Sequence, residues 1–238
     1  MTISIGTAGW AIGKTSVVSF PADGTSLERY ASVFSAVEIN SSFHRPHRAS
    51  TWQRWRDAVP QHFRFSVKIP KTISHEQKLL GCEAPLELFL EQVRELGDKL
   101  AILLLQLPPK LEFDASATEG FFATLRSRCS TLVVCEPRHA SWFEEDADAL
   151  LRTIGVARVA ADPARHCDAS VLGGWRGLSY FRLHGSPVIY RSTYADRIGD
   201  YAKHLKREEA EGRPTWCIFD NTASSAAVGD ALLLQNWL

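Results

Sequence analysis

Short runs of apolar residues recur along the chain, and longer stretches with helical spacing separate most of them. The runs predict eight strands, at residues 3–7, 36–40, 63–68, 101–107, 132–135, 156–161, 178–183 and 215–219. The run AILLLQL at 101–107 is almost entirely apolar, which is typical of a parallel strand buried on both faces. The pattern therefore predicts an α/β protein in which strands and helices alternate.

Several of the predicted helices begin at a Ser or Thr that is followed three residues later by Glu or Gln, the spacing of a capping box. The pairs are Thr25–Glu28, Ser50–Gln53, Ser116–Glu119 and Ser141–Glu144. The segment 164–177 has no helical period and contains three glycines, so it predicts a loop with at most a degenerate helix. The long connection 69–84 is either a binding loop or a solvated basic loop.

Eight strands with intervening helices predict a single (β/α)8 TIM-type barrel over residues 1–238, with a degenerate sixth helix. The alternative is a doubly wound open sheet, which typically carries a glycine-rich phosphate loop after its first strand. Gly6-Thr7-Ala8-Gly9 matches neither the GxGxxG nor the Walker pattern. We therefore favour the barrel.

Polar residues stand where the apolar strands end. They are Glu38, Asn40, Lys68, Gln106, Glu136, Arg138, Asp162, Arg182, His184, Asp220 and Asn221. In a barrel the carboxyl ends of the strands converge on one mouth, where active sites of this fold lie. The pattern therefore predicts a functional mouth, although Glu136–Arg138 or Asp162–Arg182 would also serve as a structural ion pair.

The composition of the chain limits the partners and the cellular location that we expect. Lys and Arg balance Asp and Glu at 27 each, so a whole-molecule attraction to nucleic acid is not expected. The five cysteines are scattered without a CxxC pair, which favours reduced thiols and argues against a thiolate zinc site. No apolar run is long enough to span a bilayer, and Ile3-Ser4-Ile5 reads as a strand rather than a signal peptide. We expect a cytoplasmic protein with no membrane partner.

The residue types at the predicted mouth favour an enzyme that binds a small anionic ligand and performs acid–base chemistry. The catalytic candidates are Glu38, Glu136, His184 and Asp220. The basic candidates for holding a phosphate or carboxylate are Lys68, Arg138 and Arg182. The other ligand-binding candidates are Asn40, Gln106, Asp162, Tyr190, Tyr194 and Asn221.

Two other functions stay open. One is metal-dependent hydrolysis of phosphodiesters or nucleic acid, as in endonuclease IV-type barrels, with a divalent metal as cofactor. Its ligands would be Glu38, Glu136, Asp162, His184 and Asp220. A single histidine and several cationic neighbours argue against this site. The other is a non-catalytic module in which loop aromatics such as Trp10 and Phe43 contact nucleic acid or a protein.

Seven motifs in order resemble the family of the domain of unknown function 72, also called YecE-like. They are IGTAGW, VEINSSF, FSVKIPKTISH, LLLQLPP, VCEPRHASW, YFRLHG with Tyr190 and Tyr194 behind it, and FDNT. The resemblance covers nearly the whole chain. It implies a TIM barrel, in agreement with the strand count, and it implies no particular reaction.

Overall fold

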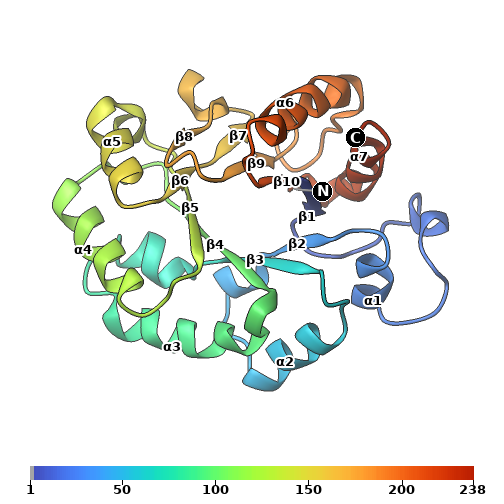
Figure 1. Cartoon of the computed structure of the whole chain (residues 1–238), viewed down its shortest axis with the longest axis horizontal. Coiled ribbons are helices and arrows are strands. Elements are labelled where there is room, and N and C mark those ends of the chain that lie inside the picture. Colours follow the sequence, from blue (N-terminus) through green and yellow to red (C-terminus); the bar gives the residue numbers. More distant parts are fainter. Residues whose placement is uncertain (1–2) are drawn as a thin grey trace.

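Strands and helices alternate along the chain in the computed structural model, which describes residues 3–238 (Figure 1). One sheet has the order β1 (Ile3–Thr7), β10 (Thr215–Phe219), β9 (Ser179–Leu183) and β7 (Ala160–Asp162). The other has the order β2 (Ala36–Ile39), β3 (Arg64–Lys68), β4 (Leu100–Gln106), β5 (Leu132–Glu136), β6 (Ala157–Arg158) and β8 (Gly173–Gly174). The β6–β8 pair is antiparallel and the other strand pairs are parallel.

The two sheets approach each other at both edges. Beside β1 and β2, an isolated parallel bridge joins Ala8 to Glu38, and the Gly9 N–H donates to the Glu38 carbonyl at 2.8 Å. At the other edge, β6 and β7 are consecutive in the chain, and Val159 between them donates its N–H to the Cys135 carbonyl at 2.8 Å. The strands do not form one closed ladder, so the structure establishes an α/β fold with two largely parallel sheets.

Helices lie at the periphery of the sheets (Figure 1). The α-helices are α1 (Ser26–Ala31), α2 (Ala49–Asp57), α3 (Glu83–Val93), α4 (Ala115–Arg126), α5 (Glu145–Thr153), α6 (Ile198–Ala210) and α7 (Ala226–Gln235). Between β7 and β9 the chain forms a short 3-10 turn, Cys167–Ser170, and β8, which confirms the predicted degenerate sixth helix. Within residues 3–238, no helix combines the length and apolar character needed to cross a membrane.

Alternation along the strands divides the apolar core into two clusters. Side chains such as Val67, Leu103 and Phe181 belong to the cluster that also contains helix residues. Side chains one position away, such as Leu104 and Tyr180, form a separate inner cluster. Successive side chains of a strand point to opposite faces, so one face meets the helices and the other faces inward. The alternation also decides which polar strand-end residues face inward.

One predicted capping box is present and three are absent. At α1 the Thr25 side chain accepts from the Glu28 N–H, and the Glu28 carboxylate accepts from the Thr25 N–H, as predicted. The helix predicted from Ser50 instead follows Arg48 without a side-chain cap. The sequence spacing therefore located this helix but not its first residue.

The other two capping boxes do not form. In one case a different residue caps the helix, and in the other a distant segment uses the serine hydroxyl. Asp114 rather than Ser116 caps α4, and its carboxylate accepts from the Ala117 N–H at 2.8 Å. The Ser141 hydroxyl accepts from the Phe113 N–H at 2.8 Å and lies in a 3-10 turn, Ala140–Phe143, while α5 begins at Glu145. A hydroxyl used by a distant segment is not available to cap its own helix.

Candidate functional site

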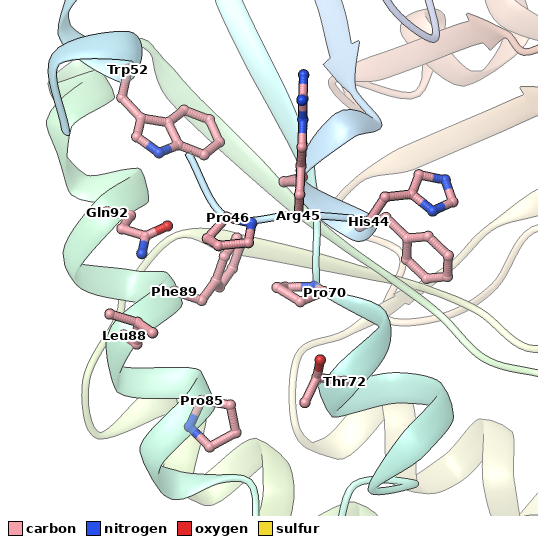
Figure 2. Close-up of a pocket in the computed structure, with 12 residues that line it drawn as sticks. His44, Arg45, Pro46, Trp52, Pro70, Thr72, Pro85, Leu88, Phe89 and Gln92 are labelled. Atoms are coloured by element: carbon pink, nitrogen blue, oxygen red, sulfur yellow. The ribbon is translucent and has the colours of Figure 1, made fainter. Parts of the chain in front are cut away.

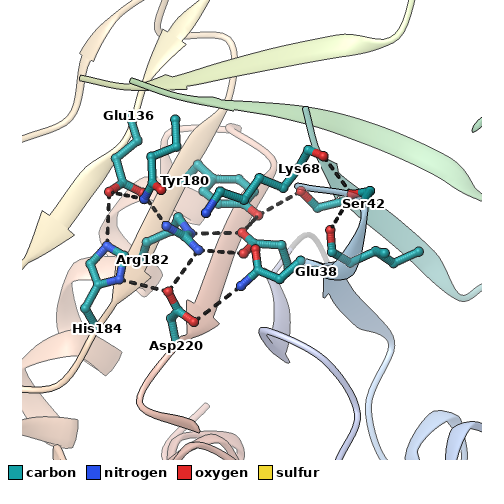
Figure 3. Close-up of polar contacts among 12 residues, drawn as sticks. Glu38, Ser42, Lys68, Glu136, Tyr180, Arg182, His184 and Asp220 are labelled. Carbon is teal, nitrogen blue, oxygen red and sulfur yellow. Dashed lines mark hydrogen bonds and ion pairs between the residues drawn. The ribbon is translucent and has the colours of Figure 1, made fainter. Parts of the chain in front are cut away.

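A buried cluster of charged side chains is centred on Arg182 of β9 (Figure 3). Its guanidinium donates two hydrogen bonds to the Glu38 carboxylate, from Nε to Oε2 at 3.0 Å and from Nη2 to Oε1 at 2.7 Å. Nη1 donates to Glu136 Oε2 at 2.5 Å, and Nη2 also donates to Asp220 Oδ2 at 3.0 Å. One side chain therefore links β9 to β2, to β5 and to the residue that follows β10.

His184 lies between two of these carboxylates. Its Nδ1 is 3.0 Å from Asp220 Oδ2 and its Nε2 is 3.1 Å from Glu136 Oε1. Burial opposes the charged ring, but Glu136 and Asp220 raise the pKa of His184 above its ordinary value. With a carboxylate beside each nitrogen, the ring forms both hydrogen bonds when it is protonated, and neither nitrogen is then left to act directly on a ligand.

The carboxylates of the cluster are saturated with donors. Burial disfavours the charge on Glu136, but Arg182 and His184 hold the pKa of that carboxyl well below its usual range. Gln106 Nε2 and Arg138 Nη2 also donate to Glu136 Oε1, at 2.9 Å and 3.1 Å. A carboxylate that is charge-paired and hydrogen-bonded in this way is a weak base.

The other two carboxylates of the cluster, Glu38 and Asp220, also accept hydrogen bonds in addition to those from Arg182. The Tyr180 hydroxyl donates to Glu38 Oε2 at 2.9 Å and lies 2.9 Å from Ser66 Oγ. Asn40 Nδ2 approaches Asp220 Oδ1 at 3.4 Å.

Tyr180 is a site residue that the sequence prediction missed. Its position two residues before Arg182 was the available signal, because that spacing puts both on one face of a strand.

Lys68 differs from every other charged group of this region. It ends β3, its residue is 8% exposed, and its Nζ lies 4.1 Å from the centroid of the Phe43 ring. Across residues 3–238, no hydrogen bond or ion pair of its ammonium is present. Burial, reinforced by the positive charge of Arg182, lowers the pKa of Lys68 to about 8. Figure 3 shows this side chain beside the saturated cluster.

Basic and aromatic side chains surround this lysine at the mouth. His75, from the loop after β3, packs edge-on against Phe43 with ring centroids 5.0 Å apart. Burial and the positive charges of Lys68 and Arg138 lower the pKa of His75. Arg138 and Tyr190 line the same cleft, and the Tyr190 ring meets the His184 ring edge-on with ring centroids 5.9 Å apart. A cleft of about 220 Å³ is lined by Glu136, Arg138, His184, Ile189 and Tyr190 among others.

Three of the predicted ligand-binding residues lie away from the cluster. Asp162 pairs with Arg197 at 2.9 Å and with the Tyr201 hydroxyl, and the predicted Asp162–Arg182 pair does not form. Alternation explains this error, because Asp162 shares a strand face with Ala160, which packs in the helix-side core. The alternation of side chains along the strand therefore turns Asp162 away from the mouth.

Tyr194 and Asn221 hold the chain that follows β9. The Tyr194 hydroxyl accepts from the Gly185 N–H at 2.9 Å and donates to the Asp162 carbonyl at 2.7 Å. Asn221 Nδ2 donates to the Ser192 carbonyl at 2.9 Å and to Asp230 at 2.7 Å. Both side chains are buried, and their hydrogen bonds support the loop that follows β9.

The ligand set expected for a divalent metal does not fit this arrangement. Glu38, Glu136, His184 and Asp220 do come together, but the Arg182 guanidinium fills the space between the carboxylates. Both nitrogens of His184 are already engaged. In the described part of the chain, no three His, Cys, Asp or Glu side chains are arranged to hold a metal ion.

A second cavity, of about 250 Å³, lies between α3 and the loops after β2 and β3 (Figure 2). Its lining is mainly apolar and includes Pro46, Pro85, Leu88 and Phe89. It shares Phe43 with the mouth, but it holds none of the clustered carboxylates. The chemistry-bearing groups therefore concentrate at the mouth.

The fold and site define a class: an α/β protein whose inward strand ends carry a saturated ion-pair cluster with an unpaired lysine beside it. The chain belongs to the family described as protein of unknown function DUF72, which matches residues 4–238. This confirms the family that the seven sequence motifs predicted.

Curated relatives carry names that assign no activity. The UPF0759 protein YecE of Escherichia coli strain K12 is 37% identical over 84 residues, or 35% of this chain and 31% of YecE. The match thus spans about a third of the length of that relative. The UPF0759 protein YunF of Bacillus subtilis strain 168 is 23% identical over 257 residues, covering 94% of this chain and 90% of YunF.

Solved structures share the fold. A DUF72 family protein from Enterococcus faecalis V583 is similar with a TM-score of 0.84 at 20% identity, covering 99% of this chain and 95% of its own. A DUF72 family protein from Thermotoga maritima MSB8 has a TM-score of 0.72 at 23% identity and covers 98% of both chains. A xylose isomerase-like TIM barrel/4-hydroxyphenylpyruvate dioxygenase fusion protein has a TM-score of 0.53 at 11% identity, over 99% of this chain and 41% of that one.

Proposed function

We propose that the protein is a TIM-barrel enzyme that binds a small anionic ligand at the carboxyl ends of its strands. The Ala8–Glu38 bridge and the continuity of β6 with β7 support a barrel, because they bring the two sheets together at both edges. The similarity to a xylose isomerase-like TIM barrel supports the same fold. Active sites of such barrels lie at this end of the strands.

The unpartnered ammonium of Lys68 is the observation that carries the ligand class. Three carboxylates of the cluster face Arg182, Arg138 and a protonated His184, so these charges balance without Lys68. A buried charge without a partner is costly. A phosphate or carboxylate held between Lys68 and Arg138 would supply the missing negative charge through charge-assisted hydrogen bonds.

The geometry also redistributes the acid–base roles. Glu38, Glu136 and Asp220 are saturated, and His184 donates from both nitrogens. The lowered pKa of Lys68, about 8, lies nearer neutral pH than its ordinary value, and the lowered pKa of His75 favours the neutral ring that can accept a proton. A proton-transfer group works best when its pKa lies near the working pH. We therefore assign proton transfer to Lys68 and His75.

Thermal unfolding in matched ionic strength tests the anion site. Inorganic phosphate and small carboxylates should stabilise the wild type relative to chloride. At one hundred times its dissociation constant a ligand stabilises by about 2.7 kcal/mol, which raises the melting temperature by roughly 5–10 °C for a chain of this size. Lys68→Met and Arg138→Met should lose this shift.

Lys203→Met is the matched control, because Lys203 lies on the exposed face of α6 and should keep the full response to anions. Equal shifts in Lys68→Met and the wild type would contradict the proposal. A stoichiometric divalent ion whose stabilisation disappears in Glu136→Gln would instead support the metal-dependent hydrolase.

The free thiols Cys82, Cys129, Cys135 and Cys217 support a cytoplasmic location as part of this proposal.

A further inference from the structure

Two lysines of the chain are buried to the same degree but differ in their partners. Lys68 and Lys99 are each 8% exposed. Lys99 Nζ donates to the carbonyls of Arg56 and Val59, both at 2.6 Å. Lys68 Nζ has no such acceptor within residues 3–238. It is not among the fully buried atoms without a partner, so this nitrogen is not completely covered. Its amine is therefore unengaged and keeps contact with the mouth.

An amine acts as a nucleophile only in its neutral form, with its lone pair free. Burial in a site that already contains Arg182 favours that form of Lys68. The nearby carboxylates do not restore the charge by pairing, because Arg182 and His184 hold them. The three carboxylates still oppose the lowering of the Lys68 pKa through their charge, but none of them forms an ion pair with its ammonium within residues 3–238.

We propose that Lys68 is the nucleophile of an imine-forming reaction, and that its partner is the carbonyl carbon of a small anionic aldehyde, ketone or 2-oxo acid. This inference rests on the proposed function, because the anionic group of the substrate occupies the site at Arg138. The cleft of about 220 Å³ is lined by Arg138 but not by Lys68, so it would hold the anionic end of the substrate while the carbonyl group extends toward Lys68.

The step balances without an oxidant or reductant. His75 takes one proton from the Lys68 ammonium, and the Nζ lone pair then forms a bond to the carbonyl carbon. The carbonyl π electrons move to oxygen, and a proton passes from the newly bonded, positively charged Nζ to that oxygen to give a neutral carbinolamine. The carbinolamine C–O bond breaks with a proton returned by His75, and water leaves. One ammonium and one carbonyl thus give one protonated imine and one water.

His75 is placed for this proton transfer. It contacts the same Phe43 ring that covers Lys68 Nζ. Its Nδ1 is 2.9 Å from Ser74 Oγ, which orients the ring, and burial together with Lys68 and Arg138 favours its neutral form. A neutral, oriented imidazole can accept a proton at neutral pH.

Reductive trapping tests the inference. The full chain is incubated at pH 7.5 with glyoxylate, pyruvate or glyceraldehyde 3-phosphate, reduced with sodium borohydride, and mapped by peptide mass spectrometry. We expect one adduct per chain, at Lys68, with at least about tenfold more product than at Lys99 or the exposed Lys203, because a lower pKa raises the neutral fraction. Excess phosphate should lower the Lys68 yield.

Lys68→Arg separates this inference from the proposed function. It keeps the positive charge and removes the primary amine, so it should still be stabilised by phosphate but give no adduct at residue 68. Phosphate stabilisation of the wild type without a Lys68 adduct would overturn the imine and leave the anion site standing. Adducts spread evenly over the lysines of the wild type would also overturn it. Neither stabilisation nor adduct would overturn both.

Discussion

Lys99 and Lys68 show how differently the two ends of one sheet use a buried charge. Lys99 directly precedes β4, and its ammonium holds two backbone carbonyls at the amino end of the strands. Lys68 ends the neighbouring strand β3, where its ammonium lies beside a charged cluster without a partner of its own. The two residues are equally buried, so burial alone does not distinguish them.

The difference lies in the acceptors that the fold provides. At the amino end the lysine joins segments of backbone and contributes to stability. At the carboxyl end Arg182 pairs with the carboxylates, and none of these three forms an ion pair with the lysine. This division supports the proposed barrel, because the amino end of that fold serves stability and the carboxyl end serves function.

Breaking the cluster itself should have the largest effect. Arg182→Met would leave Glu38, Glu136 and Asp220 buried without their shared countercharge. Removing one partner of a buried ion pair costs about 3–5 kcal/mol, so we expect a loss of at least this size in urea unfolding. Arg197→Met is the control, because the Arg197–Asp162 pair is half-exposed and is worth about 1 kcal/mol or less. Equal losses in the two variants would contradict the special status of Arg182.

Removing each lysine in turn should change the free energy of unfolding differently. Lys99→Met loses two charge-assisted hydrogen bonds and leaves two carbonyls without a donor, for a loss of about 2–3 kcal/mol. Lys68→Met removes an unpartnered buried charge, so its free energy of unfolding should stay equal or rise. Both values come from urea unfolding at pH 7. A Lys68→Met variant as destabilised as Lys99→Met would show that Lys68 has a structural partner.

The pH dependence of stability gives a gradual signal that reports on Lys68 alone. The pKa of Lys68 is about 8 in the folded chain against an ordinary value of 10.5, so the unfolded chain binds more protons between these values. Stability should therefore rise with pH from 8 to 10.5 relative to Lys68→Met, with a slope of at most about 1.4 kcal/mol per pH unit. Parallel curves for the two proteins over this range would rule out a depressed pKa at Lys68.

Much of the fold was predictable because strand periodicity is local information. The predicted strands at residues 3–7 and 215–219 coincide with β1 and β10, and the segment without helical period lacks an α-helix. The interruption of the sixth strand at Val159 was not predictable, because the run 156–161 is apolar on both sides of Val159 except for Arg158 and contains no glycine or proline. Helix caps were predicted poorly, since Ser141 bonds a segment far away in the sequence.

The site was predictable as a set of residues but not as a set of partners. The polar strand ends indicated Glu38, Glu136 and Asp220, and the structure brings them together. The sequence did not show that one arginine would satisfy all three carboxylates, because that depends on the lateral order of strands that are distant in the chain. The unpartnered state of Lys68 follows from the same order and was therefore also hidden.

Arg182 also restricts how the sheet can assemble. In the native alignment it pairs with Ile218 across β9 and β10, with Phe181 and Leu183 in the helix-side core. A β9 strand shifted by one residue would turn these apolar side chains inward and carry Arg182 into that core, because side chains alternate along a strand. Such a mispaired intermediate would bury the arginine in an apolar layer. It would also leave Glu38, Glu136 and Asp220 without their shared positive partner. The charged layer thus discriminates against misaligned folding intermediates that a purely apolar strand would tolerate.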